Sequence, residues 1–78
     1  MSRHTIYRPG DSTLVVGWDR PLRYFFAILY QDGEVLEHYV QLELDDLENA
    51  GVPAPVLEQL RLEEAGEVDT NVVKDWRQ

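Results

Sequence analysis

The sequence predicts a single α+β domain over residues 1–78: an antiparallel sheet of three or four strands from the first 42 residues, with two or three short C-terminal helices on one face. Three observations predict this class. β-Branched and aromatic residues dominate the chain as far as Leu42. The Asp32-Gly33 dipeptide separates two such segments, as in a hairpin turn. After Leu42 the pattern changes to acids and leucines with single Gly and Pro residues, which is typical of short helices.

Each expected strand is bounded by turn residues. Pro9-Gly10 ends the first extended segment, and residues 19–22 form the reversal after the second. Asp32-Gly33 suits the positive φ angles of a two-residue type I′ turn, so the segments on either side of it form a hairpin. The expected strands are residues 5–8, 14–18, 23–31 and 34–42.

Helical patterns follow in the C-terminal half. Residues 45–50 have acids at the N-terminal end, where the helix dipole favours them, and Gly51 as a stop. Pro55 suits the first turn of a second helix, which is expected to reach Glu64 and to end at Gly66. Its apolar stripe is Val56, Leu57 and Leu60, and its water-facing residues are Glu58, Gln59, Glu63 and Glu64. The tail, residues 69–76, is expected to form a last short helix with Val72, Val73 and Trp76 on one side.

The hairpin turn fixes a register and therefore two faces. If Gln31 lies opposite Glu34, directly opposed residues share a face along both strands. The expected core face holds Phe25, Ala27, Leu29, Leu36, His38, Val40 and Leu42. The other face holds Tyr24, Phe26, Ile28, Tyr30, Val35, Glu37, Tyr39 and Gln41, with Phe26 directly across from Tyr39.

Three interpretations of this second, aromatic face stay open. In the first interpretation, this face is covered by the strand with Trp18 or by the tail through Val72, Val73 and Trp76. Alternatively, it is partly open and binds a protein, because tyrosine-rich apolar patches with polar rims are typical of interfaces. In the third interpretation it stacks nucleic-acid bases. The acidity of the chain argues against the third, since stacking platforms are normally combined with a positive groove.

The charge of the chain is negative and uneven. The net charge is −8, and residues 24–73 carry twelve acids against the single base Arg61. Such a field repels phosphate backbones and anionic membranes and attracts basic partners. It also keeps a small protein soluble and monomeric, which is the simpler interpretation. We therefore expect neither direct nucleic-acid binding nor membrane binding.

Few residues suit catalysis or ligand chemistry. The chain has no cysteine, which excludes disulfides and cysteine zinc sites and favours a reducing, cytoplasmic location. His4 is expected near a frayed terminus, and His38 as a half-buried structural residue. No serine lies in a nucleophile elbow, no glycine-rich loop could cradle phosphate, and Leu44 and Leu47 interrupt any calcium-loop pattern. We expect neither a cofactor nor a metal, and no enzymatic activity; an enzyme active only as an oligomer is a distant alternative.

The remaining candidates are surfaces for a protein partner. The segment 17–22 is either a surface loop that meets a partner through Trp18 and Arg20, or a turn in which Gly17 permits close approach and Trp18 anchors the sheet. The acidic stretch from residue 43 to 69 is expected to contact a basic protein site. The full set of expected partner-binding residues is Trp18, Arg20, Tyr24, Phe26, Tyr30, Tyr39, Asp45, Asp46, Glu48, Glu63, Glu64 and Glu67.

Size and charge together favour a small interaction or inhibitor module. In these two properties alone the chain resembles phage- or plasmid-encoded inhibitors such as anti-CRISPR proteins, some of which imitate nucleic acid; no motif links it to a family. The resemblance implies a basic protein partner, one that ordinarily holds nucleic acid. The alternative is a structural homodimer or complex subunit that associates through the aromatic sheet face, with the acids serving solubility only.

Overall fold

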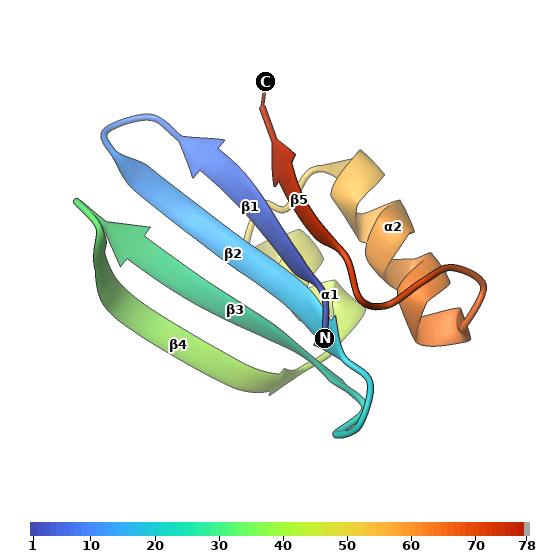
Figure 1. Ribbon diagram of the computed structural model, residues 1–78. Coiled ribbons are helices and arrows are strands. Elements are labelled where there is room, and N and C mark those ends of the chain that lie inside the picture. Colours follow the sequence, from blue (N-terminus) through green and yellow to red (C-terminus); the bar gives the residue numbers. More distant parts are fainter. Residues whose placement is uncertain (78) are drawn as a thin grey trace.

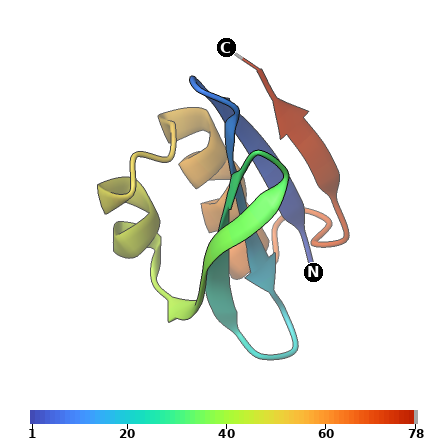
Figure 2. The ribbon, with the colours of Figure 1, turned by 90° about the vertical axis from the view of Figure 1, so that its left-hand side faces the viewer.

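The computed structural model describes residues 1–77, and within them the chain forms five strands and two helices. One mixed sheet has the order β4-β3-β2-β1-β5, and both helices lie on the same side of it (Figures 1 and 2). The α+β class is confirmed, although the sheet has more strands than expected and one of them is parallel. The elements are β1 (Arg3–Arg8), β2 (Ser12–Asp19), β3 (Tyr24–Gln31), β4 (Glu34–Leu42), α1 (Leu44–Asn49), α2 (Ala54–Ala65) and β5 (Val73–Trp76).

The tail is a strand, so the expectation of a third helix over residues 69–76 was wrong. β5 pairs in parallel with β1, with His4 opposite Lys74 and Ile6 opposite Trp76. The pairing begins where the Arg3 amide donates to the carbonyl oxygen of Val72, at 2.8 Å. Without β5 the outer edge of β1 would have no backbone partner, and satisfying that edge outweighs a weak helical pattern of three apolar residues.

The β3–β4 hairpin begins as expected and then departs from the simple register. Asp32 and Gly33 both have positive φ, and Tyr30 pairs with Val35. Leu29, however, pairs with Glu37, so that Leu36 is an extra residue in β4. An extra residue in one strand moves every following side chain to the opposite face.

The face assignments in the middle of β4 were therefore wrong, whereas Val35 opposite Tyr30 and Leu42 on the core face are as expected. Tyr39 pairs with Ala27 and lies on the helix-bearing face, not across from Phe26. His38 pairs with Ile28 and lies on the face without helices. A second register shift occurs near Gln41, whose φ is +58°. It brings Leu42 opposite Phe25. The two irregularities leave only a short regular stretch in the middle of β4.

The core lies between the sheet and the two helices. Val56 and Leu60 of α2 are fully buried, as their spacing predicts, and Leu47 of α1 joins them. Trp18 packs on Phe25, with ring centroids 4.7 Å apart, so it anchors the sheet from within. The cluster consists of Ile6, Leu14, Val16, Trp18, Phe25, Ala27, Leu47, Val52, Val56 and Leu60.

The face without helices is covered only in part. Phe26 is 4% exposed because it packs over Gly17, where a Cβ atom would come within 2.6 Å of the Phe26 ring and would also overlap the carbonyl oxygen of Ser2. Neither Trp18 nor Trp76 covers this face, since both pack against the core on the other side. Tyr24, Ile28 and Tyr30 are half-buried there. The aromatic face is thus neither closed nor a continuous open platform.

Candidate functional site

A buried polar cluster links the N-terminal strand to α2 and β5. His4 Nε2 lies 2.7 Å from Glu63 Oε2, and neither side chain is exposed to solvent. The indole Nε1 of Trp76 donates to His4 Nδ1 at 3.0 Å, and the side-chain amide of Gln59 donates to Glu63 at 3.1 Å. The expectations of a frayed His4 and a water-facing Glu63 were both wrong. β1 is an interior strand, because β5 pairs with its second edge, and His4 lies against Glu63 of α2.

The hydrogen bonds assign the tautomer of His4. An indole N–H can only donate, so Nδ1 of His4 must accept and the ring proton resides on Nε2. A neutral imidazole therefore donates to an ionised Glu63. Burial raises the pKa of Glu63, but the hydrogen bonds from His4, Ser2 and Gln59 outweigh it and leave that pKa below its ordinary value.

This cluster has the residue types of a catalytic site but not its access. Ser2, His4 and Glu63 are at most 1% exposed, so a substrate cannot reach them in this fold. The Ser2 hydroxyl oxygen accepts from the Trp18 amide at 3.0 Å, which ties the N-terminus to β2. The cluster holds elements together. Over residues 1–77, no group of three or more His, Cys, Asp or Glu side chains is arranged to bind a metal ion.

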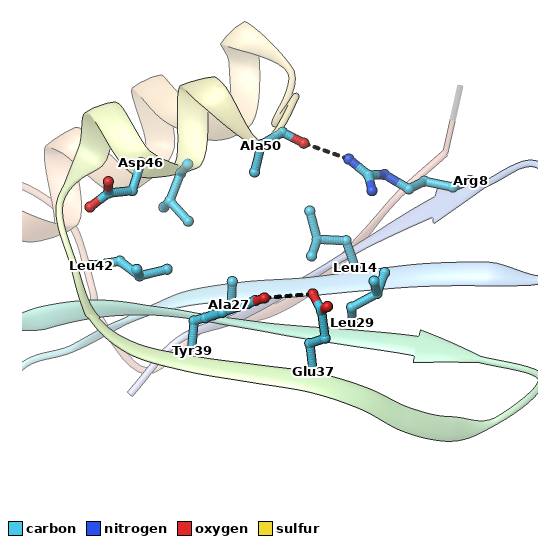
Figure 3. Close-up of a pocket in the computed structure, with 10 residues that line it drawn as sticks. Arg8, Leu14, Ala27, Leu29, Glu37, Tyr39, Leu42, Asp46 and Ala50 are labelled. Atoms are coloured by element: carbon cyan, nitrogen blue, oxygen red, sulfur yellow. Dashed lines mark hydrogen bonds between the residues drawn. The ribbon is translucent and has the colours of Figure 1, made fainter.

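An accessible groove lies between α1 and the β3–β4 half of the sheet (Figure 3). Its volume is about 260 Å³. The groove exists because α1 has only six residues and does not cover β4, and because the register shift brings Glu37 and Tyr39 to this side. Its floor is Leu14, Ala27, Leu29, Leu42 and Leu47, and its rim is Arg8, Glu37, Tyr39, Asp46 and Ala50.

The rim is held by hydrogen bonds. Arg8 donates to the carbonyl oxygen of Ala50 at 2.6 Å, which closes one end of the groove (Figure 3). The Tyr39 hydroxyl donates to Glu37 Oε2 at 2.7 Å, and this hydrogen bond raises the pKa of Tyr39. The hydrogen bond orients the carboxylate of Glu37 toward Tyr39. The result is an apolar floor beneath fixed polar walls.

Asp46 stands on the α1 side of the groove. Its Oδ2 accepts from the Glu43 amide at 2.8 Å, as part of a reciprocal capping box at the start of α1. The side chain is therefore oriented by the helix itself. Glu37 and Asp46 both line this groove, and its one basic residue, Arg8, donates to the Ala50 carbonyl.

A second, acid-lined hollow lies on the other side of α1. It has a volume of about 370 Å³ and is lined by Glu43, Asp45 and Glu64, with Arg23 and Tyr24 opposite them. Asp45 and Asp46 are consecutive, so the first turn of α1 contributes one carboxylate to each hollow. The structure therefore gathers acids from β4, α1 and α2 around α1, and we call this region, with α1 at its centre, the α1 end.

β4 is an open sheet edge with exposed apolar side chains. It is the terminal strand of the sheet, and its residues from Glu34 to Gln41 are all exposed. Within residues 1–77 it supplies four of the eight exposed large hydrophobic side chains: Val35, Leu36, Tyr39 and Val40. Exposed apolar strands at a sheet edge are sites at which another chain pairs.

The structure divides the residues expected to bind a partner into distinct groups. Three of them are buried, namely Trp18, Phe26 and Glu63, although Trp18 contributes to the lining of the acid-lined hollow. Those at the two hollows are Tyr39 and Asp46 at the groove, and Tyr24, Asp45 and Glu64 at the acid-lined hollow. Those that line neither are Arg20, Tyr30, Glu48 and Glu67. In the segment 17–22, the interpretation of Trp18 as an anchor is correct, with Asp19 holding the turn through the Arg23 and Leu22 amides.

Sequence reasoning missed two rim residues, Arg8 and Glu37. Glu37 was expected on the aromatic face, and nothing in the β4 sequence marks Leu36 as an extra residue. Arg8 comes to the groove through a contact with Ala50, 42 positions away, which no local pattern encodes.

Comparisons of the chain with protein-family models, with curated proteins and with solved structures find no match. Among the described residues, no helix has the length and apolar character needed to cross a membrane.

Proposed function

We propose that this protein is a small, non-enzymatic interaction module that binds a basic protein surface through the α1 end of the molecule. The observation that carries the proposal is the pair of acid-rimmed hollows on either side of α1, one with Glu37 and Asp46 and the other with Asp45 and Glu64. A partner with matching Lys and Arg side chains would meet carboxylates from three elements at once.

Each hollow also has one base, Arg8 at the groove and Arg23 at the acid-lined hollow, and in both the acids outnumber it. Arg61, the single base between residues 24 and 73, is bound to Glu58 by two hydrogen bonds of 3.0 and 2.7 Å and holds the pKa of that carboxyl below its ordinary value. Exposed charges interact over a Debye length of about 8 Å at physiological salt. The carboxylates around α1 therefore act together on an approaching partner, raising its association rate and favouring basic sites over acidic ones.

The partner class that best fits is a protein whose basic site ordinarily holds nucleic acid. Such a site already concentrates Lys and Arg side chains. An acidic module can therefore bind the same cations that ordinarily contact the nucleic acid. Bound there, the chain would act as an inhibitor, in the manner of the anti-CRISPR proteins that it resembles in size and charge. The net charge of −8 also disfavours direct nucleic-acid binding by this chain.

A homodimer or complex subunit is the second candidate. It is favoured by the uncovered face of the sheet, where Tyr24, Ile28 and Tyr30 are half-buried and Val40 is 47% exposed. Apolar association of this kind does not weaken as salt screens charge. Ionic strength therefore separates the two candidates.

The experiment is affinity capture with the tagged full chain from a nuclease-treated lysate of the source organism, eluted with a salt gradient. The test variant removes three exposed acids at the α1 end: Asp45→Asn, Glu48→Gln and Glu64→Gln. A matched control removes three exposed acids at the far turns of the sheet: Asp11→Asn, Asp32→Asn and Glu34→Gln. We expect a specific partner that leaves at moderate salt, is lost by the test variant and is kept by the control. Equal capture by all three proteins would refute the role of the α1 end.

A further inference from the structure

The geometry points to a specific occupant for the groove of Figure 3. We propose that it receives one large apolar side chain from an extended, Lys/Arg-rich segment of the partner, and that this segment pairs with the free edge of β4. The inference rests on the proposed function, because it names the part of the basic partner that is bound. It adds an anchor and a binding mode that acidity alone does not provide.

The size of the groove favours a side chain over a free ligand. Its volume of about 260 Å³ lies below the range of about 300 to 1,000 Å³ that is usual for small-molecule pockets. Its floor is entirely aliphatic, with Leu14, Leu29 and Leu42 from three different strands. A leucine, phenylalanine or tryptophan side chain would cover this floor and release the water above it.

The charge of the rim specifies what flanks that side chain. Glu37 and Asp46 stand on the sheet side and the helix side of the groove, and each is held by a hydrogen bond within the protein, from Tyr39 and from the Glu43 amide. Arg8 faces the Ala50 carbonyl and closes one end. An apolar side chain that enters between two carboxylates is best accompanied by cations on the same face of its strand, two positions before and after it.

The edge of β4 supplies the backbone partner. Between the irregularities at Leu36 and Gln41, β4 pairs regularly with β3 through Glu37, His38 and Tyr39. Its other edge pairs with no strand formed by residues 1–77. A peptide added there would place alternate side chains on the helix-bearing side, next to Glu37 and Tyr39, where the groove opens. The pairing and the anchor therefore fit one extended segment.

The test uses the isotope-labelled full chain and three blocked heptapeptides as probes. The first has the sequence Thr-Lys-Thr-Trp-Thr-Lys-Thr, in which both Lys share one face of the strand with Trp. The second replaces its Trp by Ala, and the third replaces every Lys by Glu. Binding is followed by backbone amide shifts. We expect the first peptide to bind about tenfold or more tightly than the second, a difference of about 1.4 kcal/mol. Shifts should gather at residues 37–40 and in α1, and the acidic peptide should not bind.

A variant pair locates the anchor. Ala50 and Ala54 are both exposed, but only Ala50 lines the groove. Ala50→Leu should fill the groove, so that the Trp peptide and the Ala peptide bind this variant with about equal affinity. Ala54→Leu should bind the Trp peptide more tightly than the Ala peptide, as wild type does. Equal binding of the Trp and Ala peptides to the wild-type chain would overturn the inference, whatever the folding of either variant.

The outcomes separate this inference from the function on which it rests. If both Lys peptides bind equally and the α1-end acid variant still loses its captured partner, the acidic function stands and the groove is not an anchor. If no Lys peptide binds and that variant captures as well as wild type, both proposals fail. β4 shifts that depend on protein concentration without peptide would show a second copy at this edge, which also overturns the inference.

Discussion

The imidazole of His4 and the carboxylate of Glu63 meet at 2.7 Å inside the protein, although 59 positions separate them in the chain. The contact joins β1 to α2. Trp76 extends it to β5 through the second ring nitrogen of His4, so one neutral imidazole connects three elements. Both ring nitrogens of His4 have partners, and buried groups that pair in this way specify an arrangement, because another packing would leave them without partners. Among the described residues, Glu63 Oε1 has no hydrogen-bond partner. These hydrogen bonds fix both the position of α2 and the place of the tail.

The first prediction concerns stability in acid. The folded-state pKa of Glu63 is lower than its ordinary value of 4.5, so its ionised form contributes stability that is fully present above that value. This contribution is lost as the pH falls through the lowered pKa. Urea denaturation measures the free energies of unfolding of wild type and Glu63→Gln as a function of pH. Their difference should be constant above pH 4.5 and should narrow below it. Parallel curves would mean that Glu63 does not titrate as the hydrogen bonds imply.

The second prediction concerns the anchor of β5. Trp76→Phe keeps an aromatic ring over the core but removes the indole N–H that donates to His4 Nδ1. Leaving a buried acceptor without a partner costs about 1 to 3 kcal/mol, and we expect that loss in the free energy of unfolding. Val73→Thr is the control, because Val73 is 78% exposed and lies in the same strand. A loss in the control as large as that in Trp76→Phe would place the effect in the strand pairing and not in the indole hydrogen bond.

The sequence predicts the elements whose cause is local. The Asp32-Gly33 turn, the glycine ends of both helices and the Val56/Leu60 stripe all depend on neighbouring residues, and each is found as expected. β5 and the burial of His4 depend on partners far along the chain. A four-residue strand has too few side chains to reveal its period, and its pairing with β1 exists only in the folded sheet.

The third prediction concerns the two neighbouring phenylalanines. Phe25 is 1% exposed in the core, and Phe26 is 4% exposed over Gly17 on the opposite face. We therefore expect Phe25→Ala and Phe26→Ala to lower the free energy of unfolding by similar amounts, about 3 to 5 kcal/mol each. Chemical denaturation of the two variants measures this. A Phe26→Ala loss below about 1 kcal/mol would show that the face without helices is open in solution.

The fourth prediction concerns Gly17. A Cβ atom at this position would overlap the carbonyl oxygen of Ser2 and lie 2.6 Å from the Phe26 ring. Because the first obstacle is backbone, a side-chain rotation cannot relieve it. Gly17→Ala should destabilise the fold by about 1 to 3 kcal/mol or more. Gly10→Ala is a useful comparison. A Cβ atom added at Gly10 would meet no neighbouring atom, so only the positive φ of that residue opposes the change. Thermal unfolding that leaves Gly17→Ala at the wild-type midpoint would contradict this packing.

The candidate site could be predicted only in part. The acidity of residues 43–48 is evident in the sequence, and three of these acids border the hollows, Asp46 at the groove and Glu43 and Asp45 at the acid-lined hollow. The groove itself depends on the extra residue at Leu36, which turns Glu37 and Tyr39 toward the helices, and on the long-range contact between Arg8 and Ala50. Trp18 and Glu63 have the residue types of a binding surface but are held in the interior by packing and hydrogen bonds.

The most direct measurement for the proposed function is the backbone amide footprint of the captured partner on the isotope-labelled full chain. The account predicts shifts or protection in the middle of β4, residues 37–40, and in α1, which weaken together as salt is raised. A footprint confined to Ile28 and Tyr30 on the face without helices, and unchanged by salt, would contradict it and favour the homodimer or complex subunit.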